Sequence, residues 1–347
     1  MRTWNAKPVL ATAVCAVLLA GTAACGGEPA SEPDDKTIVL YSGRNETLVK
    51  PLFEMFTKKT GIEIKARYGS TAQMAAQLTE EGDKSPAEAF LSQDAGGLGA
   101  VNKKGLLATL PAEVTGKVPA AYRAKDGNWV GVTARSRVLV YNPSLVKKEE
   151  LPSSVFDLTD PKWRGKVAVA PTNGSFQAFV TAVRVQHGEA KAKEFFTALK
   201  ANDAQIRDNN IAIVEEVDSG KVAVGLVNHY YLGEVAKERG TTPDKLNAKL
   251  HFFAAGDSGA MVNASGVGVL RRSAADPDVR ALVDYLLSDE AQTWFAATTY
   301  EYPLVSGAPA PAYVPTLAEL KVPDIDLNDL GTLEASIALI KSTGLTP

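Results

Sequence analysis

The sequence predicts an α/β protein in which helices cover a largely parallel sheet, arranged as two lobes with a ligand cleft between them. Three observations favour this class. Beyond residue 36, short β-branched runs alternate with segments of helical periodicity along the chain. The length of 347 residues suits about two domains. A composition of 45% hydrophobic and 22% charged residues is typical of a folded globular protein, not of a disordered or polytopic membrane chain.

The first elements follow the order strand, helix, strand, helix, strand. β-Branched or alternating runs predict the strands, and apolar side chains three or four residues apart predict the helices. The first helix is expected to end before Gly61. This order predicts parallel strands joined by right-handed crossovers. The five ranges are 37–41, 48–59, 62–68, 71–80 and 87–91.

The rest of the chain repeats the alternation until Pro303 and a proline-rich run at 308–315 end it. In open sheets of this kind, ligands bind beyond the carboxyl ends of the strands, where loops converge. Further strands are expected at 137–141, 166–170, 222–227 and 266–270, and further helices at 177–187, 190–201, 278–287 and 290–298.

Residues 1–24 have the pattern of a secretory signal peptide, with a basic start, an apolar centre and small residues at the end. The segment Thr22-Ala23-Ala24-Cys25 resembles a bacterial lipobox, in which Cys25 is lipidated and becomes the mature N-terminus. Residues 25–36 are rich in Gly, Pro, Ser and acids, which predicts a disordered tether. The chain is therefore expected outside the cytoplasm, anchored to the cell membrane by lipid. The alternative is a soluble secreted protein cut near Ala24.

Charge and cysteine content exclude several functions. A net charge of −3 argues against non-specific nucleic-acid binding, which needs an excess of basic residues. The two cysteines are Cys15, inside the predicted signal peptide, and Cys25. The mature folded body is then expected to lack free thiols, and with them cysteine catalysis, thiolate metal sites and disulfides.

Two adjacent tyrosines, Tyr230 and Tyr231, follow the predicted strand at 222–227. Neighbouring residues of a strand point to opposite faces, so we expect this pair to converge in a loop. Phenolate oxygen is a hard anionic donor that suits a small trivalent cation. The alternative is a pair of packing aromatics.

Six spaced segments occur in order along the chain: Leu40–Arg44, Phe90–Gly99, Asp160–Lys166, Asn228–Tyr231, Gly256–Ala260 and Glu301–Pro303. Together they resemble the ferric-iron-binding receptors of bacterial ABC importers, over essentially the whole mature chain. The resemblance implies a class II periplasmic-binding-protein fold, with two lobes, a cleft and a hinge. Lobe 1 would comprise residues 37–132 and 257–347, and lobe 2 residues 133–256.

The same resemblance implies a ligand and partners. The transported ligand would be Fe(III), held with an anion such as carbonate, phosphate or citrate, and Tyr230 and Tyr231 match the paired tyrosine ligands. The implied partners are an ABC permease and its ATPase, with membrane lipid bound through Cys25, no nucleic acid, and a monomeric receptor. The implied anion-binding residues are Thr172, Asn173, Gly174, Ser175, Asn210, Asn228 and Arg44.

The chain departs from the family pattern at two positions. Asn45 stands where many relatives place a ligating histidine, and Gln93 stands where some place a glutamate. Asp94, one residue along, is the nearest candidate carboxylate ligand, and Glu46 is a second. Asn45 and Asp94 have an alternative role as caps of the helices that follow them.

Cationic and aromatic neighbours complete the candidate site. Phe176 falls where another branch of the family contributes a third tyrosine. Arg44, with Arg135 or Arg137, suits an oxyanion because a guanidinium donates in a fork; their alternative role is in ion pairs. His229, beside the tyrosines, either ligates or points away.

The leading hypothesis is a receptor that closes on ferric iron and delivers it to a permease, without enzymatic activity. The alternative is a receptor of the same fold for another small ligand, such as a phosphonate, a polyamine or another oxyanion. A third hypothesis comes from Gly256-Asp257-Ser258-Gly259, which looks like the nucleophile segment of serine proteases. It would make the protein a secreted hydrolase.

Overall fold

The computed structural model describes residues 36–346 except 306, 321 and 324. The predicted signal peptide (1–24), Cys25 and the predicted tether up to residue 35 lie outside the described residues. Contacts group the chain from Lys36 onward into one compact unit. No helix in the described part combines the length and apolarity that a membrane crossing requires.

The strands form a mixed sheet in the order β2-β1-β3-β9-β4-β7-β5-β6, and β8 and β10 also pair with β4. β1 is parallel to β2 and β3, and β5 is parallel to β6 and β7, as the sequence predicts. β4 and β9 run antiparallel to their neighbours. The strands are β1 (Thr37–Ser42), β2 (Glu63–Tyr68), β3 (Ala89–Ser92), β4 (Val130–Tyr141), β5 (Val167–Val169), β6 (Gln205–Ile206), β7 (Val224–Asn228), β8 (Lys249–His251), β9 (Val262–Val269) and β10 (Tyr302–Pro303).

Each predicted helical range corresponds to a helix of the structure, namely α1, α2, α5, α8 or α9, and capping residues explain where several helices begin. Asn45 caps α1, Ser70 forms a capping box on α2, and Asp94 caps α3. The predicted break between two helices near residue 188 appears as a kink at Gly188, where φ is 82°. The helices are α1 (Glu46–Thr60), α2 (Thr71–Glu81), α3 (Ala95–Lys103), α4 (Ala112–Thr115), α5 (Gly174–Ala201), α6 (Asn210–Asp218), α7 (Tyr230–Glu238), α8 (Pro277–Leu286), α9 (Asp289–Thr298) and α10 (Leu333–Ser342).

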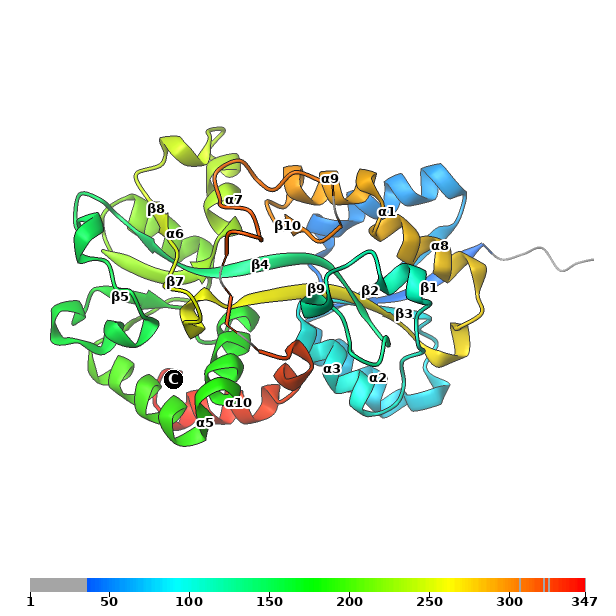
Figure 1. Ribbon diagram of the computed structural model, residues 1–347, viewed down its shortest axis with the longest axis horizontal. Coiled ribbons are helices and arrows are strands. Elements are labelled where there is room, and N and C mark those ends of the chain that lie inside the picture. Colours follow the sequence, from blue (N-terminus) through cyan, green and yellow to red (C-terminus); the bar gives the residue numbers. More distant parts are fainter. Residues whose placement is uncertain (1–35, 306, 321, 324, 347) are drawn as a thin grey trace, which may run out of the picture. The chain divides into compact units, whose positions relative to one another are not determined.

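Two long strands, β4 and β9, cross the middle of the sheet and join its two halves (Figure 1). All residues of both strands are buried, so neither shows the alternation of a half-exposed strand. The predicted range 137–141 therefore covers only the end of β4. The Cα pairing between β4 and β9 runs from Val130–Val267 to Ser136–Val262.

The apolar side chains gather in three clusters. One packs around β1, β3 and β9, a second around α5, and a third around α6 and α7. The C-terminal segment contributes to more than one of them: Leu327 and Leu330 belong to the first, and Leu339 and Ile340 of α10 belong to the second. The two lobes with boundaries near 132 and 257 stay a prediction.

Candidate functional site

Tyr230 and Tyr231 occupy the first turn of α7, directly after β7. The expectation of a loop at this position was wrong, because the chain turns straight from the strand into a helix. The two rings lie with centroids 4.2 Å apart and planes inclined by 32°. Both side chains are buried, and they lie at a helix N-terminus, whose partial positive charge favours phenolate oxygens.

His229 holds the start of this helix in place. Its Nδ1 accepts a hydrogen bond from the Ser136 N–H at 3.1 Å, so Nε2 carries the proton and donates to the Tyr300 carbonyl at 2.8 Å. Burial lowers the pKa of His229 to about 4, so the ring is neutral. Both ring nitrogens are thus engaged, and His229 positions the tyrosines.

A buried carboxylate, Glu301, lies between two arginines beside Tyr230. Arg44 donates to it twice, at 3.0 and 2.9 Å, and Arg135 forms an ion pair with it at 3.0 Å. The hydroxyls of Thr133 and Thr299 also donate to its Oε2. Burial alone would raise the pKa of Glu301, but the two guanidinium groups lower it to about 2. In this conformation the fork of Arg44 faces Glu301, and its predicted role toward an anion stays untested.

A small cavity of about 10 Å³, roughly the space of one water molecule, is lined by several predicted site residues but not by Tyr230 or Tyr231. A wider opening of about 380 Å³ shares Gln93, Asp94 and Gly174 with it. Residues that are far apart in the sequence therefore face one space. The lining of the small cavity is Gln93, Asp94, Arg135, Arg137, Gly174, Ser175, Ala178, Asn228, Met261 and Asn263.

The predicted anion-binding residues cluster at the N-terminus of α5. Asn173 caps the helix, since its Oδ1 accepts from the Ser175 N–H at 2.9 Å and from the Ser175 hydroxyl at 2.7 Å. Asn210 donates to Ser175 Oγ at 3.2 Å, while its own buried Oδ1 finds no hydrogen-bond partner among the described residues. Thr172 lines the wider opening and Asn228 the small cavity. Backbone N–H groups at such a helix start suit an anion.

The predicted carboxylate and amide ligands fall in two places. Gln93 and Asp94 line both spaces, and Asp94 Oδ1 also accepts from the Gly97 N–H at 3.0 Å. Burial raises the pKa of Asp94, although that bond and Arg135 act against the rise. Asn45 is exposed, caps α1 through the Thr47 N–H at 2.9 Å, and lines neither space. Capping is thus the observed role of Asn45, and Asp94 combines capping with a place at the cavity.

Two further candidates lie away from the cavity lining. Glu46 is exposed and pairs with Lys50 on the surface of α1 at 3.4 Å. Phe176 is fully buried in the cluster around α5, with its ring centroid 5.8 Å from that of Phe179. Neither side chain faces the space that Gln93 and Asp94 line.

Several residues of the site escaped the sequence analysis. Asn263 and Met261 reach the cavity from the start of β9 and the residue before it. Glu234 lies one turn after Tyr230, and burial and the charge of Glu301 raise its pKa to about 7. The only sequence signal for these residues was the spacing of Tyr230 and Glu234, which places both on one face of a helix.

The protease-like segment has a different role in the structure. Ser258 donates to Gln186 at 2.5 Å and contacts His187 Nε2 at 2.9 Å. Asp257, which a triad would place behind the histidine, accepts instead from Ser154 and the Val155 N–H. In the described part of the chain no carboxylate bonds to His187, so the orienting member of a triad is missing.

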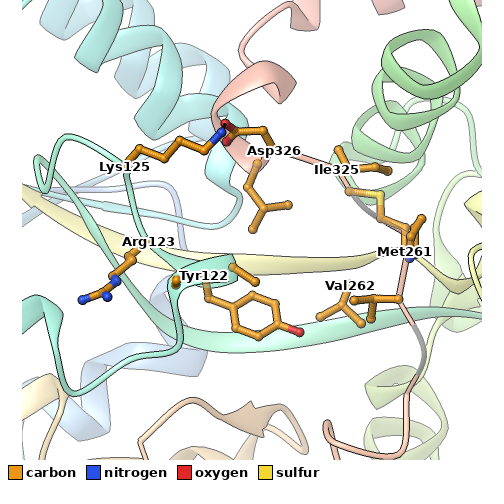
Figure 2. Close-up of a pocket in the computed structure, with 12 residues that line it drawn as sticks. Tyr122, Arg123, Lys125, Met261, Val262, Ile325 and Asp326 are labelled. Carbon is orange, nitrogen blue, oxygen red and sulfur yellow. Dashed lines mark ion pairs between the residues drawn. The ribbon is translucent and has the colours of Figure 1, made fainter.

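A separate cavity of about 320 Å³ lies between residues 120–125 and the C-terminal residues 322–323 and 325–327. Figure 2 shows Lys125 meeting Asp326 at its edge, an ion pair of 2.6 Å. Tyr122 and Met261 also line it.

Over residues 36–346, apart from 306, 321 and 324, no three His, Cys, Asp or Glu side chains gather as a metal site would require.

Comparison with known proteins gives consistent matches over most of the chain. Residues 83–328 match the family described as bacterial extracellular solute-binding protein. The Fe(3+)-binding periplasmic protein of Serratia marcescens is 32% identical over 93% of this chain and 94% of its own length. The major ferric iron-binding protein of Neisseria meningitidis serogroup B is 32% identical over 91% of this chain and 95% of its own.

Two solved structures are similar in sequence and in shape. The structure of iron-bound HitA from Pseudomonas aeruginosa has a TM-score of 0.82 and 36% identity, and the match covers 89% of this chain and 99% of that one. The structure of Trichodesmium IdiA (FutA) in complex with iron and citrate ligands has a TM-score of 0.75 and 30% identity. The match covers 89% of this chain and 100% of that one.

Proposed function

The chain belongs to the bacterial extracellular solute-binding protein family, and on that premise we propose that it binds ferric iron outside the cytoplasm and delivers it to an ABC permease. The predicted α/β fold of the class II periplasmic-binding-protein type is confirmed by its structural neighbours. The names of the two curated relatives, each 32% identical, support ferric iron as the ligand.

The observation that carries the proposal is the pair of buried phenols at the start of α7. Two phenolates supply hard anionic oxygens for a trivalent ion, and the helix N-terminus favours their charge. Arg135 favours the ionised form of Tyr230, although burial dominates and raises the pKa of that phenol well above its usual value. Iron must therefore displace the proton, and acid should weaken its binding.

The remaining ligands come from the surfaces around the small cavity. Asp94 is the nearest carboxylate, with Gln93 beside it, and Asn45 would have to leave its capping role to take part. The anion would bind at Thr172–Ser175, Asn210 and Asn228. Metal and anion together would stabilise a closed state of the two lobes by binding that state more tightly than the open one.

Anchoring, partners and oligomeric state are part of the proposal. Lipid on Cys25 would hold a monomeric receptor at the outer face of the cell membrane, within reach of the permease and its ATPase. Replacing Cys25 by Ala should release the protein from membranes into the soluble fraction. Continued partition of the Cys25→Ala protein into membranes would contradict the anchor.

The proposal is tested by titrating the apo-protein with ferric nitrilotriacetate and recording visible absorption. Tyrosinate coordinated to ferric iron gives a charge-transfer band, so the titration should colour the protein. Tyr230→Phe combined with Tyr231→Phe should abolish the band, whereas Tyr122→Phe, in the separate cavity of Figure 2, should leave it unchanged. An unchanged band in the double variant would refute the iron site.

The neutral amide of Gln93, which lines both spaces, favours a second candidate, a receptor of the same fold for another small ligand. Amides are poor ligands for a trivalent ion, but they hydrogen-bond well to a phosphonate or a polyamine. A rise in melting temperature with such a compound, and none with iron, would favour this candidate.

A further inference from the structure

Tyr300 has a strained backbone conformation directly after α9. Its φ is 57°, in the left-handed region that a bulky side chain rarely enters. It follows Thr299, the C-cap of α9, at a position where many helices end in this conformation and where glycine is preferred. Tyrosine costs free energy here that glycine would not, and strain of this kind is typical of positions with a function.

The ring of Tyr300 packs against α7, whose first turn carries the paired tyrosines. A Cβ added to Gly233 would come within 2.5 Å of Tyr300 Cγ, so glycine at this position allows the ring to lie directly on the helix. Tyr313 flanks the same ring, with centroids 6.0 Å apart, and its hydroxyl donates to the His229 carbonyl at 3.4 Å. The ring thus contacts α7 two residues after the tyrosine pair.

The backbone around Tyr300 contacts the residue on the other side of the pair. The Tyr300 carbonyl accepts a hydrogen bond at 2.8 Å from Nε2 of His229, which immediately precedes Tyr230. The ring of Tyr302 lies beside that of His229, with centroids 4.5 Å apart. One short segment, residues 300–302, therefore contacts the chain both before and after the paired tyrosines.

The same segment is also fixed to the middle of the sheet. Glu301 forms its ion pair with Arg135 of β4 at 3.0 Å, and Tyr302 pairs with Ala134 of the same strand. Arg135 donates in turn to the Gln93 carbonyl. The left-handed conformation at residue 300 lets the tyrosine ring face α7 while the next carboxylate faces β4. The segment therefore connects α7 to β4 and, through Arg135, to the loop that carries Gln93.

We propose that Tyr300 is a positioning residue for the metal site, whose left-handed backbone and ring together fix the first turn of α7 relative to β4 and to the loop of Gln93 and Asp94. Tyr300 lines neither the small cavity nor the wider opening, so it acts through α7. This inference deepens the proposed function and rests on it for the metal, while the effect on α7 is independent of iron. The alternative is that Tyr300 only ends α9, a role in which glycine would serve as well or better.

The test compares iron binding by wild type and Tyr300→Gly, which can keep the left-handed backbone but lacks the ring. In the titration with ferric nitrilotriacetate, Tyr300→Gly should bind iron about 10- to 100-fold more weakly, the usual range for residues that orient metal ligands. The maximum of its charge-transfer band should shift, because the phenolates meet the metal in a changed geometry. Tyr300→Phe, which keeps the ring, should restore both affinity and band. Tyr300→Asn, which also tolerates this backbone, serves if the Gly variant does not fold.

The chain offers a matched control at the end of another helix. Asp203 follows the C-cap of α5 with a φ of 55°, and its side chain is exposed and pairs with Arg164 at 3.4 Å. Asp203→Gly makes the same backbone change away from the site, and it should leave the iron affinity and the band unchanged. An equal effect of Asp203→Gly and Tyr300→Gly would overturn the proposal.

Gly233→Ala tests the contact from the side of the helix. Its Cβ would displace the ring of Tyr300, and it would also come within 2.8 Å of the Tyr313 hydroxyl, which lies at the movable end of its side chain. Gly233→Ala should therefore weaken iron binding in wild type and add little to Tyr300→Gly, where the ring is absent. Additive losses in the double variant would contradict the contact.

Amide hydrogen exchange of the apo-proteins separates the positioning of α7 from iron binding. Exchange over residues 226–236, measured by mass spectrometry, should be faster in Tyr300→Gly than in wild type and Tyr300→Phe, because the helix start loses its support. Unchanged exchange, or iron binding by Tyr300→Gly with the affinity and band of wild type, would overturn the proposal. If no protein gives a band although exchange depends on the ring, the iron function fails and the positioning of α7 stands.

Discussion

Glu301→Gln should destabilise the apo-protein by about 3 kcal/mol at pH 7. The pKa of Glu301 falls from an ordinary 4.5 to about 2 in the fold, and each unit corresponds to about 1.4 kcal/mol. Removing one partner of a buried ion pair independently costs about 3–5 kcal/mol, because the remaining charges are left uncompensated. Here two buried guanidinium groups, those of Arg44 and Arg135, would lose their shared counter-charge.

The assay is urea unfolding of wild type and variant, followed by far-UV circular dichroism from pH 7 down to pH 2. Because the folded pKa lies below the unfolded one, the contribution of Glu301 is present above about pH 4.5 and is lost as the pH falls toward 2. The difference between the two proteins should shrink over that window. Glu290→Gln removes a surface pair with Lys59 and should cost less than about 1 kcal/mol. If Glu301→Gln lowers the free energy of unfolding by no more than Glu290→Gln does, the reasoning is refuted.

Three further predictions concern stability. Because burial raises the pKa of Glu234 to about 7, the free energy of unfolding of wild type should fall by up to about 3 kcal/mol as the pH rises from about 4.5 to 7. Glu234→Gln should lack this fall. The prediction is contradicted if the urea midpoints of the two proteins change with pH in parallel over this range. Phe176→Ala should lower the unfolding free energy by about 3–5 kcal/mol by emptying a fully buried site, and a loss below about 1 kcal/mol in denaturant titration would show that the site collapses. Gly225→Ala should lower the melting temperature, because its Cβ would come within 2.2 Å of Ile213 Cγ2, whereas Gly174→Ala meets nothing and should melt within a few degrees of wild type.

Local sequence signals predicted the first strands and helices of the described chain well. The strand at 37–41 and the helix at 48–59 correspond to β1 and α1, and α2 starts at Thr71 as expected, because caps and periodic apolar positions act over a few residues. Prediction failed where burial removes the pattern. β4 is buried on both faces, so its first seven residues, Val130–Ser136, carried no alternation. α6 and α10 were missed, and α6 contains several β-branched residues that favour strands.

The sequence by itself supplied most of the chemical groups of the proposed site: two adjacent phenols, the amides of Asn210 and Asn228, and Asp94 next to Gln93. It also determined the α/β class, through an alternation that each segment expresses locally. Only the tertiary structure decided that the tyrosines begin a helix, that Arg44 meets Glu301 across 257 residues, and that no carboxylate of the described residues pairs with Arg137. Such pairings depend on which side chains are excluded from water together, and burial is a property of the folded chain as a whole.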